Sequence, residues 1–471
     1  MSHFAQAPDP DALIDAPTRE ADRYPTLSEA GRRTLDFMRE HPAAPIFRNH
    51  SGNRLTAQEV ESLRAYTQEV LAATPGWPEG GQPPWLNDFV NHACRDVPAY
   101  RGYQPLRSDG GHGAGGQAFE ALPTICRADL AADIARFVPD WVEVDRLINF
   151  RTTGTTGNPL LIASHPLVAG RYLAYHLRAL RRFGVEPRHG SGQVGVVLLG
   201  YQRKCFTYTS VTPLMGESGL AKINLHPVDW HAPQDRCTYL EAMAPEIIAG
   251  DPISFAELLS LTVKLQPRAL LSVSMMLLPG LRQALETRFA CPVLDIYSLN
   301  EVGPVAVFDP AVNGHVLLQH RLLVEILDPS GHRVPPGERG EITLTGGFNF
   351  CLPLLRYRTG DYAALSCAGP TPVLLGLSGR PPVRFRTAQG QWVNNIDVTH
   401  ALGALALPQF GLHQRADGSL TLRLSHSALA LGPAALLALR PLLGDVLMDV
   451  QAIAMQDKIV QYTTDLVEAG A

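Results

Sequence analysis

Residues 151–159 read RTTGTTGNP and place four threonines and two glycines directly before the apolar run LLIA. Backbone N–H groups and threonine hydroxyls in such a loop can donate hydrogen bonds to the oxygens of a polyphosphate. A Thr/Gly turn without a ligand is the alternative, because these residue types are common in turns. The loop is not a Walker A motif, since it lacks a lysine followed by serine or threonine.

Three later segments carry residue types that suit a nucleotide. In DIYSLNEVGP, the ring of Tyr297 can stack on a base, and the carboxylate of Glu301 can hold Mg²⁺. In LPLLRYRTGDYAAL, Asp361 follows a Thr-Gly turn and can accept hydrogen bonds from both ribose hydroxyls. The third segment, LSGR, ends in Arg380. Together these segments favour the phosphate-loop interpretation of RTTGTTGNP.

Lysine is rare in this chain. Of the 40 basic residues, four are lysine, and Lys458 is the only one near the C-terminal end. An ammonium group is a compact point charge that suits a crowded transition state, and arginine replaces it poorly. A solvated surface lysine is the alternative for Lys458.

The middle of the chain alternates strand-like and helical stretches, which is typical of an α/β domain with a largely parallel sheet. Two further strands, joined by the turn-rich DPSGHRVPPGERG, indicate a β-rich subdomain. A helix over 256–265 is predicted to begin with a capping box of Ser254 and Glu257. The predicted strands cover 194–199, 246–249, 269–273, 293–297, 322–327 and 341–345.

Changes of pattern along the chain predict three parts. Residues 1–85 are expected to form a helical extension, in which Thr56 and Glu59 have capping-box spacing. Residues 86–378 are expected to form a large body. Residues 379–471, with short strands and a Leu/Ala-rich helix, are expected to form a small separate α+β domain.

Composition excludes several other classes of protein. The net charge of −5, without a basic run, argues against a nucleic-acid partner. We expect a cytoplasmic protein with no membrane partner, because there is no signal-peptide layout and no run of 18 apolar residues. Seven cysteines without a CxxC pair predict neither a disulfide framework nor a zinc site. A GxGxxG string starting at Gly111 lacks a preceding strand and is interpreted as a loop.

The order of these segments resembles the acyl-adenylate-forming (AMP-binding) superfamily, and within it the phenylacetate–coenzyme A ligase and capsule-biosynthesis branch. The resemblance is collinear over much of the chain. It runs through HACRDVPAYR, LPTICRADLAADI, TTGTTGNP, YSLNEVGP, VPPGERGEITLTG, LPLLRYRTGD, GLSGR and DKIVQYTTDL. It implies an α/β enzyme with a large ATP- and acyl-binding body of mixed sheets, a β-rich subdomain and a small mobile α+β C-terminal lid domain.

The resemblance implies roles for the ATP-binding residues. The loop expected to hold the β- and γ-phosphates consists of Thr152, Thr153, Gly154, Thr155, Thr156 and Gly157. The residues expected around the adenosine are Asp295, Tyr297, Ser298, Asp361 and Arg380. Among them, Tyr297 would stack on adenine, while Asp361 and Arg380 would contact the ribose.

The resemblance also implies a reaction. ATP would activate a carboxylic acid to an acyl-adenylate, with Mg²⁺ on Glu301 and with Lys458 bridging the attacking carboxylate and the α-phosphate. The acyl group would then pass to a thiol of coenzyme A or of a carrier protein's phosphopantetheine. The aromatic residues Tyr201, Phe206 and Tyr208 suggest an aryl or apolar acid.

Two departures from the family pattern keep other functions open. The threonine loop ends in Asn158 where the family has lysine, and the hinge contains Pro381 and Pro382, which fix φ and stiffen it. One alternative is adenylation followed by amide or ester formation with an amine or hydroxyl acceptor. The other is a degenerate nucleotide-binding scaffold protein.

Overall fold

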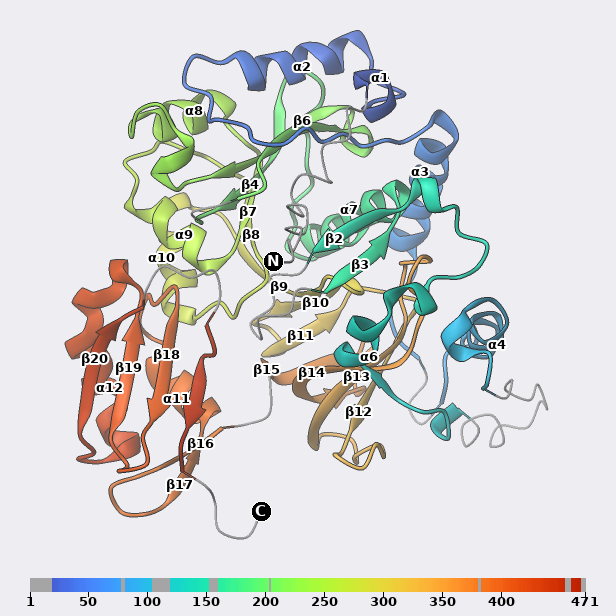
Figure 1. Ribbon diagram of the computed structural model, residues 1–471. Helices are drawn as coiled ribbons and strands as arrows, with labels where there is room; N and C mark the ends of the chain where they lie inside the picture. Colours follow the sequence, from blue (N-terminus) through green and yellow to red (C-terminus); the bar gives the residue numbers. More distant parts are fainter. Residues whose placement is uncertain are drawn as a thin grey trace, which may run out of the picture.

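A computed structural model describes residues 19–77, 81–103, 119–151, 160–202, 205–379, 383–453 and 459–466. Within these ranges thirteen strands form one mixed sheet (Figure 1). Its order is β12-β13-β14-β15-β11-β10-β9-β8-β7-β4-β6-β5, and β1 pairs with β14. The predicted α/β fold class is confirmed.

One half of this sheet is largely parallel, as the alternating pattern predicted. Strands β6, β4, β7, β8 and β9 pair in parallel, and β5 closes the edge in antiparallel pairing with β6. Continuous apolar runs suit such strands because helices cover both faces of a parallel sheet. The bounds are β4 Val194–Gly200, β5 Tyr208–Thr212, β6 Ser218–Asn224, β7 Ile247–Gly250, β8 Ala269–Ser272 and β9 Val293–Leu299.

The other half is mainly antiparallel and contains the predicted β-rich part. Strands β12 and β13 are the two strands expected on either side of the turn-rich loop, and they pair with each other in antiparallel fashion. Strand β14 pairs with β13 and β15 and, in parallel, with β1. The bounds are β1 Ile125–Cys126, β10 Gly303–Asp309, β11 Gly314–Leu317, β12 Leu322–Leu327, β13 Arg339–Gly346, β14 Leu354–Ser366 and β15 Val373–Gly379.

Helices cover both faces of the parallel half (Figure 1). On one face, α2, α8, α9 and α10 share a buried core with β4, and on the other face α3 and α7 share a core with β7. Helices α4 and α6 and a short hairpin, β2 with β3, lie farther along the body. The bounds are α4 Leu86–Asp96, α6 Arg127–Ala132, α7 Pro166–Arg182, α8 Asp235–Met243, α9 Pro252–Ser260, α10 Pro279–Phe289, β2 Ile148–Arg151 and β3 Leu161–Ser164.

The N-terminal helices are part of the body's core. After the short α1 (Glu20–Arg23), α2 (Glu29–Glu40) packs on β5 and β6, and α3 (Ala57–Ala72) packs on α7. The predicted capping box of α3 is present. The Glu59 N–H donates to Thr56 Oγ1 at 3.2 Å, and the Thr56 N–H donates to the Glu59 carboxylate at 2.8 Å.

The capping box predicted from Ser254 and Glu257 is wrong. Helix α9 begins at Pro252, and its N-cap is Asp251, whose carboxylate accepts hydrogen bonds from the Ser254 N–H and hydroxyl. Proline suits the first helical position because its missing N–H would be unpaired there, so the helix begins earlier than expected. Glu257 instead forms an ion pair with Arg236 at 2.6 Å.

The C-terminal residues build a separate four-stranded sheet with its own core, ordered β20-β19-β18-β21. One described stretch, 426–443, has the length and hydropathy of a membrane span, but its Ala435, Leu439 and Leu443 are buried in that core. The bounds are β16 Arg384–Arg386, β17 Trp392–Asn394, α11 Asn395–Leu402, β18 Phe410–Gln414, β19 Leu420–Leu424, α12 Gly432–Leu443, β20 Met448–Ala452 and β21 Tyr462–Thr464.

The C-terminal unit contacts the body at the start of α10 (Figure 1). The Gly280 N–H donates to the Gly403 carbonyl at 2.8 Å. A Cβ at position 280 would lie 2.5 Å from the Leu405 carbonyl carbon, so only glycine fits there. Leu278, just before α10, is buried in the C-terminal core. This contact fixes the C-terminal unit against one end of the body.

Candidate active site

Two residues predicted to bind a nucleotide meet in the structure. Tyr297 of β9 donates its hydroxyl hydrogen to the Asp361 carboxylate of β14 at 2.8 Å. Burial, reinforced by the Asp361 charge, raises the pKa of Tyr297 well above its usual value, so the phenol remains a donor. The two side chains must lie close together if Tyr297 is to contact the base of a nucleotide and Asp361 its ribose.

The curvature of the sheet creates this contact. Along the sheet, β9 and β14 are separated by β10, β11 and β15. Neighbouring strands lie about 4.8 Å apart, so four steps across a flat sheet would separate β9 and β14 by about 19 Å. The two side chains touch because the sheet curls between these strands.

Glu301, the predicted Mg²⁺ ligand, is buried in the turn after β9 and is 5% exposed. Its Oε1 accepts a hydrogen bond from the Tyr357 hydroxyl at 3.0 Å and forms an ion pair with Arg127 Nη1 at 3.4 Å. Pairing of β1 with β14 places Ile125 opposite Tyr357, and this brings Arg127 to the same carboxylate.

Helix α7 supports the turn that carries Glu301. The Tyr172 hydroxyl donates to the Asn300 carbonyl at 3.3 Å. Gly303 has φ of +75°, and a Cβ there would lie 2.4 Å from the Phe348 ring, so the turn requires glycine.

His176 lies one turn along from Tyr172 on the same face of helix α7. Desolvation lowers the His176 pKa to about 4, which keeps this imidazole neutral.

The other two predicted adenosine-site residues of β9 lie on either side of Tyr297. Asp295 is flanked by Arg282 Nη2 at 3.9 Å and His315 Nε2 at 3.8 Å. Ser298 is half-buried opposite Pro304 in the β9–β10 pairing.

The three aromatic residues predicted to line an acyl pocket lie around the carboxyl ends of β4 and β6. Tyr201 follows β4, and its ring centroid lies 5.7 Å from that of His226. Phe206 and Tyr208 form an edge-to-face pair with centroids 5.5 Å apart. Strand β4 lies between β6 and β7, where the strand order reverses, and ligands of open α/β sheets bind at this position.

Several predicted residues lie outside the described ranges. Lys458 and the GxGxxG string are among them. The threonine loop falls between β2 and β3, and Arg380 follows Gly379, which pairs with Asp361 in the β14–β15 register. The loop comprises Thr152, Thr153, Gly154, Thr155, Thr156 and Gly157.

The described residues fit a Mg²⁺ ion only as part of a nucleotide complex. They contain no group of three or more His, Cys, Asp or Glu side chains arranged to hold a metal. A single carboxylate, Glu301, suits Mg²⁺, which keeps several waters and is usually completed by phosphate oxygens. Glu301 would hold the ion, and Arg127 already pairs with the same carboxylate.

Sequence reasoning missed Arg127, Tyr357 and Tyr172 as site residues. Tyr357 precedes the predicted ribose-site residue Asp361 by only four positions in LPLLRYRTGDYAAL. That spacing could have identified it. Arg127 has no such local signal, because it meets Glu301 across 174 residues.

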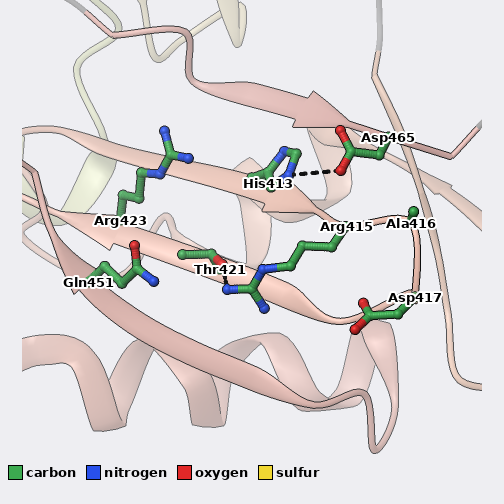
Figure 2. Close-up of a pocket in the computed structure, with 8 residues that line it drawn as sticks. All are labelled: His413, Arg415, Ala416, Asp417, Thr421, Arg423, Gln451 and Asp465. Atoms are coloured by element: carbon green, nitrogen blue, oxygen red, sulfur yellow. Dashed lines mark hydrogen bonds and ion pairs between the residues drawn. The ribbon is translucent and has the colours of Figure 1, made fainter.

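An open cavity of about 590 Å³ lies on the outward face of the C-terminal sheet (Figure 2). Two of its lining residues form ion pairs: Arg415 with Asp449 at 2.7 Å, and His413 with Asp465 at 3.4 Å. It lies on a different sheet from Tyr297, so we assign it no part in this site. It is lined by His413, Arg415, Ala416, Asp417, Thr421, Arg423, Gln451 and Asp465.

The chain shares its fold with a solved CoA ligase, as the resemblance implied. A 2-hydroxyisobutyryl-CoA ligase in the postadenylation state, in complex with R3-HIB-AMP, superposes with a TM-score of 0.59 at 19% identity over 87% of this chain and 90% of that one. The same ligase in an open conformation, with 2-HIB-AMP and CoA, gives 0.51 over 80% and 89%.

In sequence, the chain is similar to phenylacetate-coenzyme A ligases, although no family model matches it. It is 35% identical to the Pseudomonas putida protein over 89 residues and 34% to that of Escherichia coli over 90. These matches span 18% of this chain and only about a fifth of each relative. A Thermus thermophilus phenylacetate-coenzyme A ligase is 25% identical over 340 residues, 66% of this chain and 71% of that one.

Proposed function

We propose that this protein is an AMP-forming acid–thiol ligase, which activates a carboxylic acid with ATP and transfers the acyl group to a thiol. The observation that carries the proposal is the contact between Tyr297 and Asp361 at 2.8 Å. An aromatic ring and a carboxylate converge there from segments 64 residues apart, as a bound nucleoside would need. The fold shared with a CoA ligase supports the same assignment.

In this proposal the chain's own residues orient the nucleotide for attack at its α-phosphorus. The Tyr297 ring stacks on adenine, Asp361 accepts hydrogen bonds from the ribose, and Glu301 holds the metal. Mg²⁺ supplies charge neutralisation on the phosphates when bound. Lys458 neutralises charge that grows on the α-phosphoryl oxygens as the carboxylate attacks and pyrophosphate leaves.

The identity of the acid and the acceptor belongs to the same proposal. The aromatic pair Phe206–Tyr208, with Tyr201, favours an aryl or apolar acid, and the relatives named phenylacetate-coenzyme A ligase agree with this. Coenzyme A is the proposed thiol, and a carrier protein's phosphopantetheine offers the same chemical group. Five buried or half-buried cysteines are free thiols, which favours a cytoplasmic location; they are Cys94, Cys126, Cys237, Cys291 and Cys351.

The test is carboxylate-dependent ATP–pyrophosphate exchange over a panel of aryl, fatty and amino acids. We expect exchange with an aryl or apolar acid, and AMP release on adding coenzyme A. Release with amines and not with thiols would favour amide formation. ATP binding without any exchange would favour the scaffold alternative, which Asn158 and the prolines Pro381 and Pro382 suggest.

Lys458→Ala tests the catalytic assignment. We expect it to abolish adenylation while leaving thiolysis of a supplied acyl-adenylate largely intact, because the lysine neutralises charge only in the first step. Both half-reactions are measured by AMP and pyrophosphate release. Lys264→Ala, at an exposed position, is the matched control. Equal loss of both steps would contradict the assignment.

A further inference from the structure

Arg127 lies where a triphosphate would approach Glu301. Its Nη1 is 3.4 Å from Glu301 Oε1, and the Tyr357 hydroxyl donates to the same oxygen. The Glu301 side chain is 6% exposed, whereas the Arg127 side chain is 35% exposed. The guanidinium is therefore on the solvent side of a buried carboxylate.

An anion that approaches Glu301 from solvent meets the Arg127 guanidinium, which offers it a charge-assisted partner whether or not a metal is bound. An arginine can hold two acceptors at once, because its planar fork carries five N–H donors.

We propose that Arg127 binds a phosphate of the nucleotide while it holds Glu301 in place, so that one side chain serves both acceptors. This inference rests on the proposed function. It gives the polyphosphate a cation from the body, in a chain whose threonine loop ends in Asn158 and not in a basic residue. Arginine suits this role because its hydrogen bonds to carboxylates and phosphates are charge-assisted and can be bidentate.

A purely structural role is the competing explanation, since a buried carboxylate needs a partner. The two roles differ in what they predict for ligands with and without phosphates. Calorimetric titration with adenosine and with ATP in EDTA separates them, because neither measurement involves Mg²⁺ or turnover. For Arg127→Gln we expect ATP affinity to fall about ten- to a hundredfold and adenosine affinity to stay unchanged.

Matched variants sharpen the test. Arg127→Lys keeps the charge and should recover part of the ATP affinity. Arg101→Gln removes an exposed ion pair with Asp140 in the same part of the chain and should change neither affinity. If Arg127→Gln fails to fold, Arg127→Gln with Glu301→Gln removes both charges, and its ATP affinity in EDTA is compared with that of Glu301→Gln alone.

The outcomes are distinct. Unchanged ATP affinity, or equal loss for adenosine and ATP, would overturn the role of Arg127. A wild-type protein that binds neither adenosine nor ATP would instead refute the proposed function.

Discussion

At the scale of single residues, the site depends on one hydrogen bond and one shared carboxylate. Tyr297 and Asp361 hold each other at 2.8 Å, and Glu301 receives Tyr357 and Arg127 on one oxygen. These contacts orient side chains that would otherwise sample several rotamers. A site whose groups are already oriented loses less entropy when its ligand binds.

Asp361→Ala should weaken ATP binding about ten- to a hundredfold, because charge-assisted hydrogen bonds to the ribose are lost. Calorimetric titration with ATP measures this. Asp309→Ala, which removes an ion pair with Arg182, is the control and should leave ATP affinity unchanged. An unchanged affinity in Asp361→Ala would remove this residue from the ribose site.

At the scale of elements, the helices of the N-terminal extension stabilise the body. Helix α3 packs on α7, whose Tyr172 supports the turn carrying Glu301. The cap of α3 is formed by Thr56 and Glu59, which are not site residues. We therefore expect the cap to contribute to the stability of the fold and not to nucleotide binding. Sequence reasoning identified this cap because all its parts lie within four residues.

Thr56→Ala should lower the free energy of unfolding by about 1 kcal/mol, because the Glu59 N–H loses its partner. Urea unfolding followed by circular dichroism measures the change, and ATP affinity should be unaffected. Glu59→Gln should cost more, since Glu59 also forms an ion pair with Arg146 at 2.8 Å. A loss of ATP affinity in Thr56→Ala without a loss of stability would contradict this division of roles.

At the scale of the whole molecule, the C-terminal unit contacts the body at the start of α10. The Gly280 N–H bonds the Gly403 carbonyl, and the chain at 404–405 leaves no room for a side chain at position 280. If the C-terminal domain moves between two half-reactions, this contact must break and form again. A mutation that destabilises only the domain arrangement with this contact would shift the equilibrium toward arrangements without it.

Gly280→Ala should therefore displace the C-terminal domain while slightly favouring the isolated helix α10, because alanine has the higher helix propensity. We expect a larger radius of gyration in solution scattering and faster proteolysis between 379 and 383. Gly102→Ala is the control, since a Cβ there meets nothing within 4 Å. Identical scattering and proteolysis in Gly280→Ala and wild type would show that this contact does not position the domain.

The sequence by itself determined the chemical groups and most of the elements. The periodicity of strands and helices and the α3 cap are each contained in a short segment of sequence. The same holds for the motifs that carry Tyr297, Glu301 and Asp361, so all of these could be predicted from the sequence. The cap of α9 was mistaken because Asp251 and Pro252 are a stronger start signal than Ser254.

Only the tertiary structure decided which groups meet. Tyr297 reaches Asp361 because the sheet curls across four strand steps, and Arg127 reaches Glu301 because β1 pairs with β14. Neither contact has a local pattern, since each joins residues more than sixty positions apart. Sheet curvature and strand order arise from the packing of the entire core, so they cannot be predicted from short-range sequence patterns.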